Sequence, residues 1–223
     1  MATVDFLAKL VTLTPATRDQ DHVPMVVIHM PQIPDRSTAI LEGTDAPFPG
    51  LLRGMNRLAT AGAQFAVIPC NSAHHWYERL ADSQRLKILH IADAVLQELR
   101  DRASSAASVS VLATRGTIRS GFYAERLRTA GHGIVPVDPG TQLLIDQSIG
   151  ATKAGRHEHA ARFADEAARR ALAAGAQTLI LACTELPLAL KDSASLDACI
   201  DSTMALARYS VAESISNCTS GSQ

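Results

Sequence analysis

The stretch that decides the fold is residues 61–70, AGAQFAVIPC, which has a second copy at residues 174–183, AGAQTLILAC. Alanine, glycine, alanine, glutamine and cysteine match between the two copies without a gap. In each copy the glycine is typical of a helix end, the apolar run is typical of a buried strand, and the cysteine stands where that strand ends. The repeat therefore predicts two similar halves, each with a thiol at the carboxyl end of a strand.

Strand and helix patterns alternate along the rest of the chain. Apolar residues at helical spacing predict helices over 4–13, 51–61, 117–130, 156–174 and 204–216. Short runs rich in β-branched residues predict strands at 25–30, 65–68, 109–113, 134–137, 178–182 and 198–200, and a long loop is expected over 31–50. This alternation predicts an α/β fold in which each half is a mainly parallel sheet flanked by helices.

The composition is that of a folded, soluble protein. Of the 223 residues 47% are hydrophobic and 19% are charged, and the net charge of −1 gives no basic excess that would predict a nucleic-acid partner. The longest apolar runs, such as residues 178–183, are too short to span a membrane, and residues 1–20 lack a signal-peptide pattern. The four cysteines are too scattered for a disulfide framework or a zinc site, which predicts a cytoplasmic chain with reduced thiols.

The two repeated cysteines, Cys70 and Cys183, stand where ligands bind in α/β proteins, beyond the carboxyl ends of the strands. A helix N-terminus after each thiol would lower its pKa from about 8.5 towards neutrality. If the two halves face each other, one thiol lies on each side of a shared cleft. Such a pair is suited to removing a proton from one face of a carbon and returning one to the other. The alternative is a pair of inert core cysteines.

The motifs around these cysteines resemble those of the aspartate/glutamate racemase superfamily. CNSAH at 70–74 and ACTELPL at 182–188 resemble its paired signatures, and its aspartate-racemase-like branch is indicated by PQIPDR at 31–36, ATRGTIRSGFY at 113–123 and ATKAG at 151–155. The similarity covers residues 1 to about 212, with the motifs in family order. It implies a racemase that needs no cofactor, two similar pseudo-symmetric α/β domains with the active site in the cleft between them, and a homodimer.

The resemblance also assigns roles to individual residues. The acid–base groups are Cys70 and Cys183, and the substrate-binding positions are Arg36, Asn71, Ser72, Thr114, Thr117, Lys153, Thr184 and Glu185. Amide and hydroxyl donors stabilise the charge that grows on an α-carboxylate as the α-proton leaves. The two cations match positions that hold an acidic side chain. Without the resemblance, a surface charge is an equally good interpretation of Arg36 and a helix-start carboxylate an equally good one of Glu185, whereas Lys153 is more typical of a solvated residue at a helix start. No metal is expected.

The chain is expected to divide into two domains. Residues 1–103 with helix 204–217 would form the first, residues 104–203 the second, and residues 218–223 a disordered tail. Family members usually begin with a strand and a glycine-rich loop, whereas this sequence begins at the helix that resembles the element after them. The resemblance therefore predicts that either further residues precede Met1 or the first domain folds without that strand.

The leading prediction is an amino-acid racemase that acts on aspartate or a related acidic amino acid. An isomerase or decarboxylase of small dicarboxylates is the second interpretation, and the presence of both cysteines disfavours a decarboxylase with one essential cysteine. The third is a carboxylate-binding protein whose catalysis is impaired by the missing strand. A two-cysteine isomerase stays open, and intact turnover in Cys70→Ser would contradict the two-base mechanism.

Overall fold

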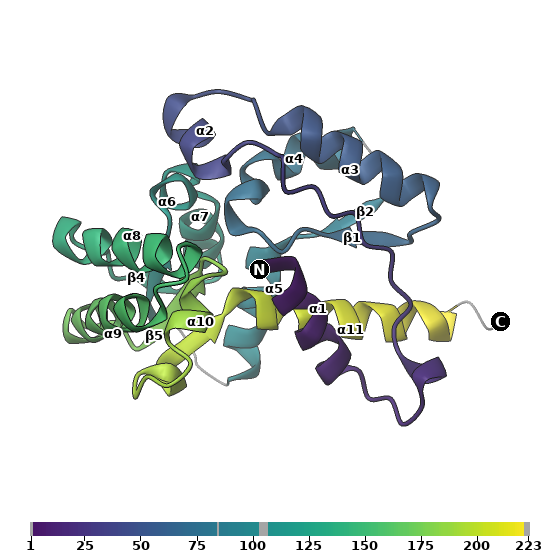
Figure 1. The fold of residues 1–223 in the computed structure, drawn as a ribbon. Helices are drawn as coiled ribbons and strands as arrows, with labels where there is room; N and C mark the ends of the chain where they lie inside the picture. The colour runs from purple at the N-terminus through teal and green to yellow at the C-terminus, as the bar shows by residue number, and fades with distance from the viewer. Residues whose placement is uncertain (1, 84, 103–106, 221–223) are drawn as a thin grey trace.

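The computed structural model describes residues 2–83, 85–102 and 107–220, and in it the chain folds around two parallel sheets (Figure 1). The smaller sheet pairs β1 (Phe65–Val67) with β2 (Lys87–Leu89). The larger sheet has the strand order β4 (Gly133–Ile134), β3 (Ser108–Ala113), β5 (Thr178–Ala182) and β6 (Cys199–Asp201). All of these pairings are parallel, so the predicted α/β class is confirmed.

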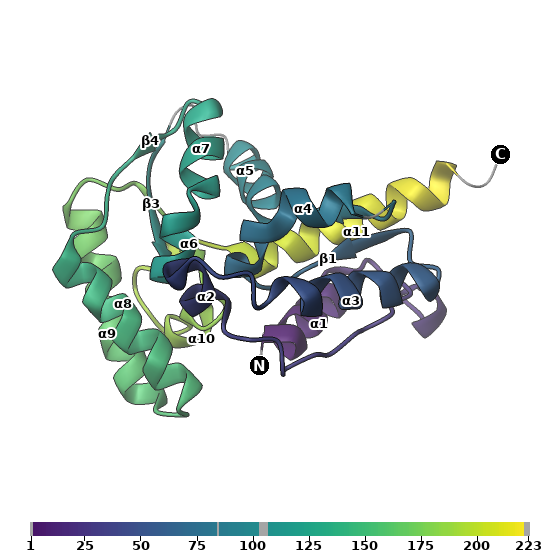
Figure 2. The same ribbon diagram turned by 90° about the horizontal axis from the view of Figure 1, so that it is seen from above.

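Helices surround both sheets (Figures 1 and 2). In chain order they are α1 (Ala2–Leu13), α2 (Arg36–Glu42), α3 (Phe48–Thr60), α4 (Tyr77–Asp82), α5 (Ile91–Asp101), α6 (Arg115–Ser120), α7 (Phe122–Thr129), α8 (Pro139–Lys153), α9 (His157–Ala173), α10 (Leu186–Ala189) and α11 (Ser202–Ser220). Short 3-10 helices lie at η1 (Asp19–Asp21), η2 (Asn71–Trp76) and η3 (Leu196–Ala198). Over the described parts of the chain, no helix combines the length and the apolar character needed to cross a membrane.

The repeated sequence is a helix–turn–strand unit in both halves. In the first copy α3 ends before Gly62, whose φ of 83° turns the chain into β1, and in the second α9 ends before Gly175, whose φ of 103° turns it into β5. Residues with a side chain rarely adopt this left-handed backbone, which explains the glycine in both copies. The two units therefore have the same local structure, and each delivers a cysteine beyond its strand.

Small side chains let the helices approach the larger sheet closely. One face of α9 is buried in a cluster with α8 and β5, and its buried members are Ala160, Ala164, Ala167, Ala168 and Ala171. A second cluster contains residues of both predicted domains, among them Phe6, Val95, Leu127, Ile180 and Leu206. The two halves thus share one hydrophobic core, and the domain boundaries expected above stay a prediction.

Residues 25–30 are the clearest departure from the sequence-based expectation. They belong to no helix or strand and pair with no strand among the described residues, and Val26 and Val27 are 47% and 46% exposed. A β-rich run becomes a strand only where another strand satisfies its backbone groups. The predicted strand is therefore wrong: the smaller sheet contains β1 and β2 alone among the described residues.

Other elements also differ from the pattern: α4, α5, α8 and α10 are helices that it does not predict, β4 is shorter than expected, and further boundaries lie elsewhere. The loop expected over 31–50 contains α2, because the side chain of Asp35 caps it by accepting from the Thr38 amide. The helix expected over 117–130 is divided at Gly121, whose φ is 76°. The tail expected over 218–223 is helical to Ser220, where α11 ends, and residues 221–223 lie outside the described part of the chain.

Candidate active site

Strand register brings the two halves of the site together. Ala113 of β3 pairs with Ala182 of β5, so the next residues, Thr114 and Cys183, leave the larger sheet side by side. Cys70 follows β1 of the smaller sheet and stands at the N-cap of η2. The carboxyl ends of the parallel strands therefore carry both thiols, as the sequence repeat predicts.

Arg36 lies against Cys70. Its guanidinium donates to the backbone oxygens of Ile33 and Pro34, at 3.1 and 3.2 Å. Burial acts to lower the pKa of Arg36, but the neighbouring side chains of Cys70, Asp35 and Glu185 raise the pKa above its ordinary value. The guanidinium is thus within electrostatic reach of both cysteine segments, because Glu185 follows the second cysteine.

Cys183 lies beside a carboxylate, whereas Cys70 lies beside a cation. Its side chain is buried, and its thiol donates to Oε2 of Glu185 at 3.1 Å, while the Thr184 hydroxyl donates to the same oxygen at 2.9 Å. Burial first, and then the charge and hydrogen bond of Glu185, raise the pKa of Cys183 well above its ordinary value. The expected lowering by a helix N-terminus is wrong for this thiol, because α10 has only four residues and the carboxylate is in direct contact.

Three of the predicted hydroxyl groups form a triangle. The Ser72 oxygen is 3.1 Å from that of Thr114 and 2.8 Å from that of Thr117, and the two threonine oxygens are 3.1 Å apart. Thr114 also caps α6 by accepting from the Thr117 amide. Ser72 follows Cys70 in η2, so this triangle ties the first cysteine segment to the start of α6 beside Cys183.

Asn71 is placed beside Cys70, but its amide is occupied by protein partners. Its Oδ1 accepts from the Tyr123 hydroxyl at 2.7 Å, and its Nδ2 donates to Oγ of Ser202 at 3.0 Å. The sequence pattern does not single out Tyr123 or Ser202, since only the fold brings α7 and the start of α11 to this segment. These contacts make Asn71 a fixed part of the site wall.

Lys153, at the end of α8, faces the same region from the second half of the chain. Its Nζ is 3.9 Å from Oδ2 of Asp35, the residue that caps α2 immediately before Arg36. Burial acts to raise the pKa of Asp35, but the Thr38 amide and the charge of Lys153 lower it overall. Lys153 also acts to lower the pKa of Cys183. The two predicted cations therefore gather beside the two thiols.

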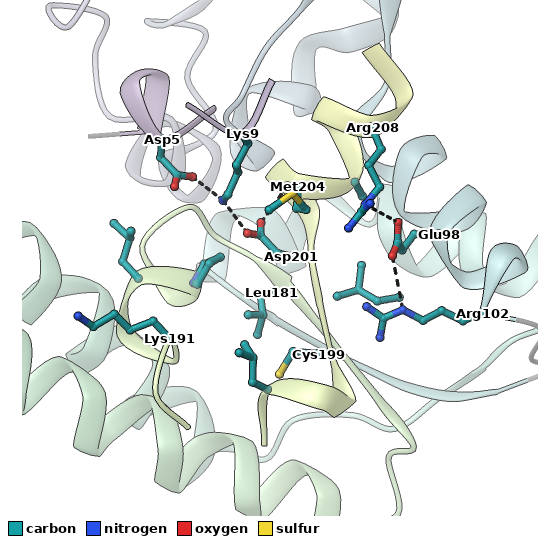
Figure 3. A pocket seen from close by; sticks show the side chains of 15 residues that line it. Asp5, Lys9, Glu98, Arg102, Leu181, Lys191, Cys199, Asp201, Met204 and Arg208 are labelled. Atoms are coloured by element: carbon teal, nitrogen blue, oxygen red, sulfur yellow. Dashed lines mark hydrogen bonds and ion pairs between the residues drawn. The ribbon is translucent and has the colours of Figure 1, made fainter. Parts of the chain in front are cut away.

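A separate pocket of about 440 Å³ lies along the edge strand β6 (Figure 3). Most of the charges that line it pair with one another: Lys9 with Asp5 and Asp201, and Glu98 with Arg102 and Arg208. Neither repeated cysteine lines this pocket. We place the candidate active site at the thiols, because there the cations and hydroxyl groups converge on reactive groups. Within the described residues, no cluster of three or more His, Cys, Asp or Glu could hold a metal ion.

Known proteins resemble this chain over nearly its whole length. The model of the family described as Asp/Glu/Hydantoin racemase matches residues 1–209. The broad specificity amino-acid racemase RacX of Bacillus subtilis strain 168 is 29% identical over 161 residues, which cover 72% of this chain and 69% of that protein.

Solved structures give the same result for the fold. An aspartate racemase of Picrophilus torridus has a TM-score of 0.83 and 29% identity, covering 96% of this chain and 89% of that one. A glutamate racemase of Campylobacter jejuni, at 20% identity, shares the fold with a TM-score of 0.61, covering 93% of this chain and 80% of that one. The two-domain arrangement is that of these racemases. The chain belongs to the Asp/Glu/hydantoin racemase family and is an amino-acid racemase of the type that works without pyridoxal phosphate.

Proposed function

We propose that this racemase acts on aspartate or a related acidic amino acid, with Cys70 and Cys183 as the two bases on opposite faces of the α-carbon. The observation that carries the proposal is the unequal environment of the two thiols. Cys70 lies against the cation of Arg36, whereas the thiol of Cys183 donates a hydrogen bond to the carboxylate of Glu185. Burial and the carboxylate of Glu185 thus favour the protonated form of Cys183, while the cation of Arg36 stands beside Cys70.

This asymmetry fits one complete proton-transfer sequence. The Cys70 thiolate removes the α-proton and becomes a thiol, and the electron pair of the broken C–H bond moves onto the substrate carboxylate. The Cys183 thiol then delivers its proton to the opposite face of the carbon and becomes a thiolate. The reverse reaction starts from the opposite protonation state. Glu185 would take part only by favouring the protonated form of its neighbour.

An acidic substrate is supported by the cations of the site. Arg36 offers a planar fork of donors and Lys153 a point charge, a pair that suits the second carboxylate of aspartate or glutamate. Ser72, Thr114 and Thr184 offer hydroxyl groups for the amino-acid portion. The related proteins carry names that include aspartate racemase and broad specificity amino-acid racemase. The homodimer stays a prediction from the family resemblance, and the cytoplasmic location stays a prediction from the sequence.

The test is α-proton exchange in deuterium oxide. Purified protein is incubated with L-aspartate, and loss of the α-proton signal is followed by NMR while D-aspartate is measured by chiral chromatography. L-Glutamate and L-alanine run alongside to compare acidic with neutral substrates. We expect exchange and D-product with the acidic amino acids, and loss of at least 100-fold of the rate in Cys70→Ser and in Cys183→Ser, as is typical when a general acid or base is removed.

Cys199→Ser is the matched control, because Cys199 is a buried thiol of β6 that donates to the Ser195 backbone oxygen and lies outside the site. It is expected to retain the wild-type rate. Full turnover in Cys70→Ser would contradict the two-base mechanism. Binding of aspartate without exchange would support the impaired carboxylate-binding protein instead, and release of carbon dioxide from a dicarboxylate would support the decarboxylase.

A further inference from the structure

A buried chain of hydrogen bonds runs from one cysteine segment to the other. The Tyr123 hydroxyl of α7 donates to Oδ1 of Asn71 at 2.7 Å, and Nδ2 of Asn71 donates to Oγ of Ser202 at 3.0 Å. The Ser202 hydroxyl in turn donates to the backbone oxygen of Leu181 at 2.8 Å. The chain therefore joins three elements that lie far apart in the sequence: η2, α7 and the β6–α11 junction, ending on β5.

The ends of this chain are next to the two thiols. Asn71 directly follows Cys70, and Leu181 lies on β5, two residues before Cys183. A displacement of Asn71 would move the backbone of Cys70 with it, whereas Leu181 is fixed in the centre of the larger sheet. The hydrogen bonds thus set the position of one thiol relative to the strand that carries the other.

Each hydrogen bond in the chain has only one possible direction. A backbone carbonyl oxygen only accepts, so the single proton of the Ser202 hydroxyl must point to Leu181. The serine oxygen then accepts from the amide nitrogen of Asn71, and the remaining amide oxygen must accept from Tyr123. Asn71, Ser202 and Tyr123 are all buried, so water does not replace a lost partner. The hydroxyl of Tyr123 is also close enough to Ser202 to interact with it, so the three side chains form one connected buried cluster.

We propose that Tyr123 and Ser202 are positioning residues that hold Asn71, and through it Cys70, in register with Cys183. The inference rests on the proposed two-base function, in which both sulfur atoms must approach the same carbon from opposite sides. Reacting atoms must lie within about 3–3.5 Å of each other, and misplacement by about 1 Å can cost on the order of 100-fold in rate. Neither residue touches the reacting atoms, so each acts through Asn71.

Kinetics of Tyr123→Phe and Ser202→Ala test the functional part. Tyr123→Phe removes the hydroxyl and keeps the ring that packs on Phe122. We expect kcat to fall by about 10- to 100-fold in either variant while KM changes less than about twofold, because alignment and not binding is lost. The double variant should be no slower than the slower single variant, because either change already breaks the chain. Tyr77→Phe is the control, since its hydroxyl donates to Ile88 outside the site.

Amide hydrogen exchange by mass spectrometry gives a readout that needs no catalysis. In Tyr123→Phe we expect faster exchange in peptides covering both 68–76 and 180–186, and in Tyr77→Phe in neither. If the wild-type protein racemised no amino acid, the proposed function would be wrong. The amide hydrogen exchange would still show whether residues 68–76 and 180–186 are coupled. Wild-type kcat in the two variants, or faster exchange confined to α7, would overturn the positioning role.

Discussion

At the scale of single residues, the site is defined by the difference between two thiols with matching flanks. Cys70 lies against the guanidinium of Arg36, whereas Cys183 contacts the carboxylate of Glu185. A cation next to a thiol stabilises the thiolate, and an anion stabilises the thiol. In the proposed mechanism the two acid–base groups start in opposite protonation states, and the two thiols differ in the charge of the side chain beside them.

Glu185→Gln tests this electrostatic difference directly. Removing the negative charge is expected to lower the pKa of Cys183, because Glu185 and burial are what raise it, and burial stays. At a fixed pH below that pKa, the rate of alkylation of Cys183 by iodoacetamide should rise by about three- to tenfold for each unit by which the pKa falls. Peptide mass spectrometry across a pH series measures the rate for each cysteine separately.

The control for this substitution is Glu158→Gln, at an exposed position in the first turn of α9. It should leave the alkylation profile of Cys183 at its wild-type position. An unchanged profile in Glu185→Gln would show that burial alone sets the protonation of this thiol, and a profile moved to higher pH would show that Glu185 lowers the pKa of Cys183.

The sequence identifies a functional residue when the evidence for its role lies in the neighbouring positions of the chain. Cys70 and Cys183 stand out because their flanks repeat, and the motif around each names its neighbours Asn71 and Thr184. Tyr123 could not be found this way, because its role depends on contact with a segment about 50 positions away. The raised pKa of Cys183 could not be predicted for the same reason. Its position before a helix predicts a lowered pKa, but burial and the contact with Glu185 in the folded protein raise it.

At the scale of elements, the sequence pattern predicts a helix or strand correctly where the residues that determine it lie within one short stretch. The helix–glycine–strand units of α3–β1 and α9–β5 are predicted because glycine, apolar run and helix all lie within one stretch. The strand predicted over residues 25–30 is wrong because a strand needs a neighbouring strand. Helix α2 is not predicted because its cap, Asp35, lies between prolines in a segment typical of a loop. Whether a segment forms a strand is thus hard to predict when the strand depends on pairing with a distant segment.

The contact between α2 and α6 gives a prediction at this scale. A Cβ atom on Gly116 of α6 would lie 2.6 Å from Cα and 2.8 Å from the backbone oxygen of Ser37 in α2, closer than atoms can pack. Gly116→Ala is therefore expected to lower the free energy of unfolding by about 1–3 kcal/mol, as overpacking does. It should also reduce activity, because α2 carries Arg36. Urea denaturation and the exchange assay measure the two effects.

Gly150→Ala is the matched control for that substitution. Gly150 lies inside α8, and a Cβ atom there would meet nothing within 4 Å. Alanine is favoured over glycine in a helix interior, so this variant should be more stable by about 0.5–1 kcal/mol. Equal effects of the two substitutions would contradict the close contact between α2 and α6.

At the scale of the whole molecule, Lys9 connects the first helix to the last part of the chain. Its Nζ lies 2.5 Å from Asp5, 2.6 Å from Asp201 and 2.8 Å from the Thr203 hydroxyl, at the rim of the pocket in Figure 3. Lys9→Met would leave two largely buried carboxylates without their cation. The free energy of unfolding should fall by about 2–3 kcal/mol, somewhat less than for a fully buried pair.

Lys87→Met is the comparison for Lys9. Lys87 pairs with Glu213 at 2.7 Å and also joins distant segments, but its side chain is 58% exposed. Exposed ion pairs contribute less than about 1 kcal/mol, so this variant should unfold close to the wild type. Similar losses in both variants would mean that burial does not set the strength of the Lys9 contacts.

The response of the molecule to acid should be governed by two buried histidines. The rings of His74 and His90 lie 4.5 Å apart. Burial lowers the pKa of His74 to about 4, and burial together with His74 and Arg126 lowers the pKa of His90 to about 2. In the unfolded chain a histidine has a pKa of about 6.5, so below that pH the unfolded state binds more protons than the folded state. Stability is therefore constant above about pH 6.5 and falls as the pH drops.

At pH 5 this difference in proton binding should cost about 2 kcal/mol for each of the two histidines. Urea denaturation between pH 7.5 and 5 measures the loss in a range where carboxylates remain mostly ionised. His74→Gln should flatten the dependence, because one of the two buried proton acceptors is gone. His157→Gln, at an exposed start of α9, should follow the wild-type curve. A wild-type curve without slope over this range would mean that both rings gain protons as easily when folded as when unfolded, which the burial of His74 in η2 and of His90 at the start of α5 argues against.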